Sequence, residues 1–336
     1  MHRTTRRWFL LSFILPVFLL FFSGAPATWG FFGHKKINEL AIYTLPEEMF
    51  GFYKHHMDFL VEHAVDPDKR RYGVKGEAEC HYIDMDRYCF DTVGCNPFHN
   101  IPRRWTDAVE MYGEDSLRAN GIVPWHVYTM TQRLTQAMKD EDVNRILRFS
   151  AEIGHYISDA HVPLHTTSNY NGQQTDQRGI HGFWESRIPE LFISDYDFFV
   201  GKARYIRAPL YYIWDRVEES YAAVDSVLGF EASLTSSFPS DRKYSYETRG
   251  QVYTKVYSRE FSEAYQAMLD GQVERRMRSA IIAVGSYWYT AWVDAGQPDL
   301  DRLLPQAMTD EDLLKIQEEL ALPGDPALKV REHDNQ

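Results

Sequence analysis

Two pairs of potential metal ligands lie near the middle of the chain. His155 precedes Asp159 by four residues, His181 precedes Glu185 by four, and His165 lies between the pairs. Side chains at positions i and i+4 share one face of an α-helix, so one cation can touch both members of a pair. Imidazole nitrogen and carboxylate oxygen are the usual zinc ligands where thiolate is absent. The segment therefore predicts a zinc site, and two pairs plus His165 suggest more than one ion.

Amphipathic helices are expected to position these side chains. Between residues 141 and 160 apolar residues recur at helical intervals, and Pro163 follows the first pair closely. The polar run at 168–174 predicts a loop, and a second helix bounded by Pro189 would carry the other pair. A His four residues before an acid is also common in surface ion pairs, so one pair alone would be weak evidence for a metal.

Helical periodicity extends over most of the chain, and convincing strand alternation is scarce. We predict an all-α fold, a single multi-helix domain over residues 29–321 with its metal site in a cleft and long loops around that site. The loops are expected at 64–100 and 161–180, and a flexible tail at 322–336. The predicted helices cover residues 46–63, 122–139, 141–160, 207–228, 250–270 and 272–294.

The chain opens with the features of a cleavable leader. Arginines at positions 3, 6 and 7 precede an apolar run at 8–22, and Ala25, Pro26 and Ala27 follow. The run is shorter than the roughly 20 residues that span a membrane, so we predict a signal peptide at 1–28. An uncleaved anchor is the alternative. The expected product is a secreted or periplasmic protein without a membrane span, and no protein partner is predicted.

The composition is acidic, with a formal charge of −12 at pH 7 that becomes more negative once the leader arginines are removed. Such a charge disfavours general electrostatic binding to nucleic acid or anionic lipid. Any recognition of phosphate must therefore use a local source of positive charge, and bound metal would supply one.

Three cysteines, Cys80, Cys89 and Cys95, lie close together in the chain. Export permits one disulfide and leaves one thiol over. A bond between Cys89 and Cys95 is favoured, although one sequence does not determine the pairing. No C-x-x-C spacing occurs, so a cysteine-based zinc site is not expected.

Five segments together resemble one enzyme superfamily. The residues from His155 to His165 read H-x3-D-x3-P-L-H, and those from His181 to Glu185 read H-x2-W-E. Both resemble signatures of the zinc-dependent phospholipase C/single-strand-specific nuclease (S-one/P-one type) superfamily. Trp29-Gly30 with His34 is similar to the family's mature amino terminus, Asp66 lies fifteen residues before His81 as a possible ligand pair, and His81-Tyr82-Ile83-Asp84 resembles its H-[FY]-I-D segment.

The resemblance implies three zinc ions, with Asp159 shared between two of them. The third ion would use the free amine and carbonyl of Trp29, which requires leader cleavage after Thr28. The pattern of small residues favours cleavage after Ala27 instead, so the exact site stays open. The implied ligand sets are Asp66, His81, His155 and Asp159; His165, His181 and Glu185; and Trp29, His34 and Asp159.

The resemblance also implies a reaction, the hydrolysis of a phosphodiester by metal-activated water. Asp159 would act as the bridging ligand. Asp84 would orient or deprotonate the water, or alternatively would only fix the orientation of a ligand. His161 lies between ligands but has no family role, so it is treated as part of the scaffold.

The substrate is open between two classes. The spacing of Trp29 and His34, the Pro-Leu-His ending and Trp184 favour a nuclease acting on single-stranded DNA and RNA. Glu185 and the interval from His165 to His181 are more typical of bacterial phospholipase C. A nuclease would stack bases on aromatic rings, and the candidates are Tyr82, Tyr170 and Phe183.

A non-catalytic zinc-binding helical protein is the alternative from another class. Structural zinc is closed by four protein ligands, whereas two of the implied sets offer only three ligand residues. That difference favours an enzyme. The H-E-x-x-H motif of zinc proteases is absent from the sequence.

Overall fold

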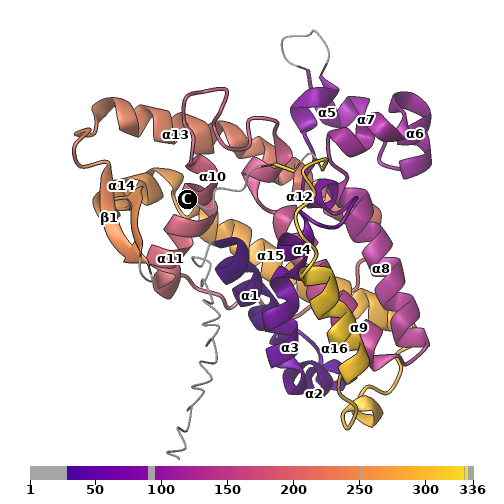
Figure 1. Cartoon of the computed structure of the whole chain (residues 1–336). Helices are drawn as coiled ribbons and strands as arrows, with labels where there is room; N and C mark the ends of the chain where they lie inside the picture. The colour runs from indigo at the N-terminus through magenta and orange to yellow at the C-terminus, as the bar shows by residue number, and fades with distance from the viewer. Residues whose placement is uncertain (1–28, 90–94, 250–251, 329, 332–336) are drawn as a thin grey trace, which may run out of the picture.

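The computed structural model describes residues 29–89, 95–249, 252–328, 330 and 331 (Figure 1). The predicted signal peptide at 1–28 lies outside the described residues. Within them, no helix combines the length and the apolarity needed to cross a membrane.

Helices α8 (Val123–Lys139) and α9 (Val143–Asp159) pack against each other as a hairpin. A short turn joins them, and Asp142 caps α9 by accepting a hydrogen bond from the Arg145 N–H at 3.1 Å. Every residue of α9 from Ser150 to Asp159 is buried. Buried polar groups need partners, so the polar residues in this half of α9 must meet polar groups from neighbouring elements.

Helix α1 (Trp29–Ile42) packs against α9 and α15 (Gln272–Asp294) at two close approaches. A Cβ added at Gly154 of α9 would lie 2.0 Å from Asn38 Oδ1, and one added at Gly285 of α15 would lie 1.9 Å from Thr44 Oγ1. Asn38 Nδ2 also donates to the Leu60 and Ala151 carbonyls, each at 3.1 Å. The missing side chain at Gly154 therefore lets α1 lie close to the polar end of α9, and the one at Gly285 lets the end of α1 and Thr44 lie close to α15.

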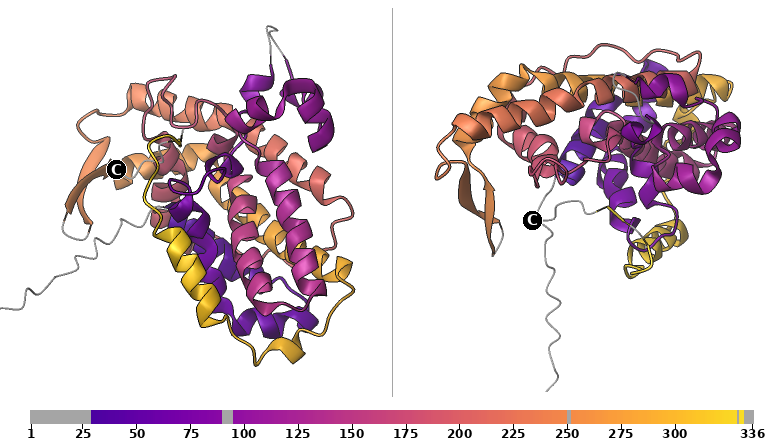
Figure 2. Two further views of the ribbon diagram at one scale, coloured as in Figure 1. Left: turned by 45° about the vertical axis from the view of Figure 1, so that its right-hand side comes forward. Right: turned by 90° about the horizontal axis from the view of Figure 1, so that it is seen from above.

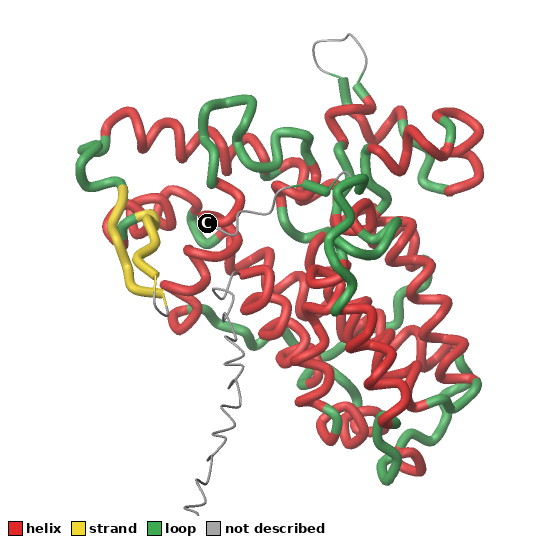
Figure 3. Tube along the Cα trace, viewed as in Figure 1, coloured by secondary structure: helices red, strands yellow, loops and turns green. Residues whose placement is uncertain are grey.

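The remaining elements surround this core, and helices dominate the trace (Figure 3). The α-helices are α2 (Glu47–His55), α3 (Met57–Glu62), α4 (Asp66–Arg70), α5 (Pro97–Asn100), α6 (Trp105–Tyr112), α7 (Glu114–Ala119), α10 (Ile180–Gly182), α11 (Ile188–Phe192), α12 (Pro209–Ala222), α13 (Val224–Ser237), α14 (Arg259–Leu269) and α16 (Asp310–Leu320). Short 3-10 turns are η1 (His63–Val65), η2 (Ala78–His81), η3 (Met85–Tyr88), η4 (Pro163–Thr166), η6 (Ile193–Asp195) and η7 (Asp301–Leu303), and η5 (Phe183–Arg187) is a π-helix.

The prediction of a mostly helical single domain is confirmed, but one predicted helix is partly wrong. In the range 250–270 only α14 is helical, whereas Val252–Tyr257 is strand β2, antiparallel to β1 (Tyr244–Arg249). Strand β2 is rich in β-branched and aromatic residues, and these favour a strand when a neighbouring segment pairs with them. This hairpin projects from the edge of the helical body in both views of Figure 2.

Two other predicted helices are each divided in the structure. The range 46–63 forms α2 and α3 with a break at His56, and 207–228 spans α12 and the start of α13. The predicted Cys89–Cys95 disulfide is present, and Cys80 is a buried free thiol.

Candidate metal centre

The end of α9 is the meeting point of polar side chains from five other segments. His34 comes from α1, Asp68 from α4, His81 from η2, His165 from η4, and His181 with Glu185 from α10 and η5. All are buried except Asp68, whose side chain is 11% exposed. Three groups of these residues each place ligand atoms within 4.8 Å of one another.

The first group joins His165, His181 and Glu185. The two histidine Nε2 atoms lie 3.1 Å apart, and Glu185 Oε2 lies 3.5 Å from His165 Nε2 and 3.0 Å from His181 Nε2. Ligands about 2.0 to 2.1 Å from a tetrahedral zinc lie about 3.3 Å from one another. The spacing of this group therefore fits one zinc ion. The π-helix η5 continues from α10 through Glu185, so the predicted i, i+4 pair is helical but not purely α-helical.

The second group joins His81, His155, Asp68 and Asp159. His81 Nδ1 lies 3.0 Å from both His155 Nε2 and Asp159 Oδ2, and His155 Nε2 lies 3.3 Å from Asp159 Oδ2. Asp68 Oδ1 lies 3.7 Å from each of the two histidine nitrogens. The separations among the His81, His155 and Asp159 atoms fit the edges of one tetrahedral site, and Asp68 lies close enough to the two histidines to be a further ligand.

The third group is built on the other oxygen of Asp159. His34 Nε2 lies 3.4 Å from Asp159 Oδ1, and the His34 ring stacks on the His155 ring with centroids 3.9 Å apart. Asp159 therefore directs Oδ2 toward the second group and Oδ1 toward His34, which is the arrangement a bridging carboxylate requires. Trp29 begins α1 five positions before His34, and its role as a ligand stays a prediction.

The structure does not bring the predicted ligand Asp66 into any of these groups. Its Oδ2 lies 2.5 Å from His63 Nδ1, and its Oδ1 accepts from Lys69 Nζ at 2.9 Å. Asp68 occupies the expected place instead. Residues two positions apart point to different sides of a helix, so only one carboxylate of this pair can face the histidines. Asp68 was not predicted as a ligand, and the sequence feature that could have indicated it is a second acid beside Pro67.

Backbone carbonyls fix the orientation of three histidine rings. The Nδ1 atoms of His155, His165 and His181 face the carbonyl oxygens of Ala64 at 2.9 Å, His81 at 2.6 Å and Tyr170 at 3.0 Å. A carbonyl oxygen only accepts, so Nδ1 carries the hydrogen, and the Nε2 of a neutral ring presents a lone pair to its group. Lone pairs directed at one point repel one another unless a cation lies between them. The donor set therefore fits a divalent metal such as zinc.

A buried layer of charged groups lies next to the Nε2 atom of His81. His81 Nε2 lies 3.5 Å from Glu77 Oε1, and Glu77 accepts from Arg70 Nε at 2.8 Å and from the Tyr156 hydroxyl. Arg70 also donates to Glu152 Oε1 at 2.5 Å. Carboxylates that orient ligand histidines are typical of metal sites. This layer was not predicted from the sequence.

Without metal, the electrostatics of the groups favour protons on some of these ligands. Burial lowers the pKa of His155, but the Asp159 and Asp68 carboxylates outweigh burial and raise that pKa to about 9. Burial would raise the pKa of Asp159, yet His155 and His165 hold it well below its usual range. Burial and the neighbouring His155 lower the pKa of His34 to about 4. A metal would therefore have to displace the His155 proton.

Arg71, Tyr82, Asp84, Tyr170 and Arg331 lie together at one side of the ligand groups, and we call this place the mouth of the centre. Tyr82, Asp84 and Tyr170 were predicted from the sequence, whereas Arg71 was not. Arg71 is 2% exposed and donates from Nη1 to Asp68 Oδ1 at 3.3 Å. Its Nε and Nη2 have no hydrogen-bond partner among the described residues. Asp84 is buried, which raises its pKa, and the guanidinium of Arg331 pairs with its Oδ2.

The three aromatic candidates separate in the structure. Tyr82 and Tyr170 line a space of about 10 Å³ together with His81, His165 and His181. Phe183 instead stacks on Tyr257 with ring centroids 3.8 Å apart and is 2% exposed, so it belongs to the core. His161 donates from Nδ1 to the Ile157 carbonyl at 2.7 Å and lies in none of the three groups, as its assignment to the scaffold requires.

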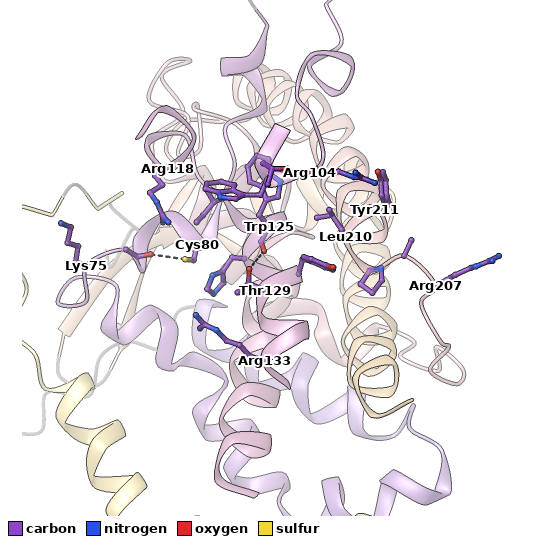
Figure 4. A pocket seen from close by; sticks show the side chains of 18 residues that line it. Lys75, Cys80, Arg104, Arg118, Trp125, Thr129, Arg133, Arg207, Leu210 and Tyr211 are labelled. Carbon is purple, nitrogen blue, oxygen red and sulfur yellow. Dashed lines mark hydrogen bonds between the residues drawn. The ribbon is translucent and has the colours of Figure 1, made fainter. Parts of the chain in front are cut away.

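A much larger pocket of about 980 Å³ is lined by other residues (Figure 4). Its lining includes Arg104, Arg118, Arg133 and Trp125, and none of the grouped ligands. Because it has no set of convergent carboxylates and imidazoles, size alone does not make it the chemical centre. The three ligand groups, and not this pocket, are therefore the candidate metal centre.

No known protein family matches the chain, and no curated protein is significantly similar to it. The sequence motifs and the geometry of the ligand groups are therefore the basis for assigning a function.

Proposed function

We propose that this chain is an exported phosphodiesterase that binds three zinc ions at the end of α9. The observation that carries the proposal is the position of Asp159, whose two oxygens face two different ligand groups. The remaining group lies beside it, since His165 Nδ1 is 3.6 Å from Asp159 Oδ1. Adjacent metals of this kind supply a Lewis acid and an activated water for attack on a phosphodiester. Closed structural zinc sites have four protein ligands, whereas the group of His165, His181 and Glu185 has three.

The protein's own residues would hold the substrate around this centre. Arg71 presents two nitrogens, Nε and Nη2, without partners among the described residues, and a buried guanidinium is well suited to a phosphate oxygen. Asp84 has an unpartnered Oδ1 and could accept a proton from a water or hold a polar edge of the substrate. These assignments give a protein with a net negative charge a local site for phosphate.

Single-stranded nucleic acid is the substrate we favour. Tyr82 and Tyr170 both lie against the flat guanidinium of Arg331, at 3.3 Å and 4.8 Å from ring centroid to guanidinium carbon. A place where a flat group lies over one aromatic ring and near a second also suits a nucleobase, because bases stack on such rings whatever their sequence.

Phospholipid is the second candidate, and the β-hairpin favours it. Tyr246, Val252 and Tyr253 are 72%, 63% and 77% exposed on β1 and β2. Exposed aromatic rings are common where proteins contact the headgroup region of a membrane. The hairpin also adjoins η5, because Tyr257 stacks on Phe183 two residues from Glu185.

The test compares the cleavage of three substrates in the presence and absence of zinc. Purified mature protein is incubated with single-stranded DNA, duplex DNA and phosphatidylcholine vesicles, each before and after chelation and after zinc is restored. We expect zinc-dependent cleavage of single-stranded DNA. Cleavage of the lipid alone would select the second candidate. Fully zinc-loaded protein that cleaves none of them would contradict the proposed function.

A further inference from the structure

The segment that follows α16 returns to the mouth of the metal centre. Helix α16 is fixed near α9 because Arg148 Nη2 pairs with Glu319 Oε2 at 2.6 Å. After it, the Asp325 N–H donates to the Tyr72 carbonyl at 2.8 Å. In Figure 1 this yellow segment runs from α16 past α4. Residues 321–327 are exposed, and the described neighbours of this stretch include Gly73, which lies against Leu322 and Pro323.

Arg331 is the part of the segment that is enclosed. Its side chain is 13% exposed, and its guanidinium lies over the Tyr82 ring, near the Tyr170 ring, and in an ion pair with Asp84. The space left between these groups and the ligand histidines is about 10 Å³, close to the volume that one water needs. A substrate could not reach the histidines by this route while Arg331 stays in place.

We propose that residues 322–331 inhibit the enzyme in cis, with Arg331 as the inhibitory group. The proposal rests on the proposed function, because it assigns Tyr82, Tyr170 and Asp84 to substrate binding. The guanidinium imitates the substrate in two respects, since it is flat enough to stack on the rings and it donates hydrogen bonds to Asp84. A tethered group competes at a high effective concentration even when its own contacts are few. Because residues 321–327 are exposed, a partner or a protease could remove the segment without unfolding the helical body.

The experiment compares four proteins with the unchanged mature chain. Arg331→Ala removes the inhibitory group, Arg331→Lys keeps the charge but loses the flat stack, and deletion of 322–336 removes the segment. Arg302→Ala is the matched control, because Arg302 is an exposed arginine that pairs with Glu141 on the surface. KM and kcat are measured on a single-stranded oligonucleotide with saturating zinc, and melting temperatures verify folding.

We expect Arg331→Ala and the deletion to raise kcat/KM at least about five-fold, mainly through a lower KM. Arg331→Lys should give an intermediate value, and Arg302→Ala should match the unchanged protein. Equal kcat/KM for Arg331→Ala and the unchanged protein would overturn the inhibition while leaving the phosphodiesterase intact. A fall in kcat/KM would also overturn it, because Arg331 would then assist the substrate.

A binding measurement separates this inference from the proposed function. A synthetic peptide covering 322–336 is titrated into the variant that lacks these residues, and tyrosine fluorescence reports the binding of the peptide. We expect binding by this peptide and none by the same peptide with alanine in place of Arg331. That result would support occupation of the mouth even if no substrate were cleaved. Equal binding of both peptides would overturn the role of Arg331.

Discussion

Asp66 and Asp68 have the same chemistry and lie two positions apart, but only Asp68 faces His81 and His155. Asp66 is held by His63 and Lys69. We expect Asp68→Asn to weaken one zinc by at least the roughly 10- to 100-fold that loss of an orienting partner costs. Asp66→Asn is the matched control and should leave zinc binding within about two-fold. Metal content after dialysis against graded zinc buffers measures both; greater loss from the Asp66 variant would restore the original assignment.

Asp159 provides a second test at the same scale. Because its two oxygens face different ligand groups, Asp159→Ala should reduce the bound zinc by two ions rather than one. His181→Ala should remove only the ion at its own group, so it serves as the comparison. Zinc per protein chain is counted by elemental analysis. An Asp159→Ala protein that keeps full zinc and full activity would contradict the bridging role.

The pKa of His155 predicts how the metal-free protein responds to pH. Its folded-state pKa of about 9 lies above the ordinary 6.5, so protonation of His155 stabilises the fold below pH 6.5. This contribution is lost as pH rises through 9 and amounts to at most about 3 kcal/mol. Urea unfolding of chelated protein at pH 6 and pH 9.5 measures it. His155→Gln should show a smaller decrease in stability between these pH values, and an unchanged decrease would contradict the assignment.

At the scale of elements, the centre depends on how closely α1 approaches α9. Gly154→Ala would place a Cβ 2.0 Å from Asn38 Oδ1, so we expect a loss of about 1 to 3 kcal/mol in the free energy of unfolding. The shift should also weaken zinc at His34. Gly229→Ala in α13 is the control, since nothing lies within 4 Å of its new Cβ and alanine favours a helix. Urea unfolding and zinc titration check both; equal stability of the two variants would contradict the close packing.

The elements also show what the sequence could predict. Helices α8, α9 and α15 agree with their predicted ranges, because apolar periodicity reports directly which face is buried. Strand β2 was missed because its stability comes from pairing with β1, which local periodicity does not record. Within the candidate site, His155 with Asp159 and His181 with Glu185 were predictable from helical spacing. Asp68, Arg71 and Arg331 were not, because their place at the centre depends on how segments far apart in the chain pack together.

The predicted flexible tail illustrates the same limit. Its polar composition and its prolines indicated only a poor ability to form a helix. The contact of Arg331 with Asp84 joins residues far apart in the chain, and no local pattern encodes such a contact. Mobility of 322–336 stays a prediction, although the described part of this segment has definite partners.

At the scale of the whole molecule, the charge of −12 sets the response of the reaction to salt. Binding of single-stranded nucleic acid weakens with salt by a slope of about 0.7 for each phosphate that cations neutralise. If metal and Arg71 supply the positive charge locally, one or two phosphates are involved. We therefore expect log KM to rise with log salt by a slope of no more than about 1.4.

A steeper dependence of KM on salt would be expected if the nucleic acid were bound in the arginine-lined pocket. Four of its lining residues are Arg104, Arg118, Arg133 and Arg207, and a nucleic acid lying across them would engage several phosphates. KM measured from 50 to 200 mM salt, for the unchanged protein and for Arg104→Ala, distinguishes the two possibilities. A slope above about 3 that falls in the variant would contradict local recognition. A shallow slope that is the same in both proteins would confine substrate binding to the metal centre and its mouth.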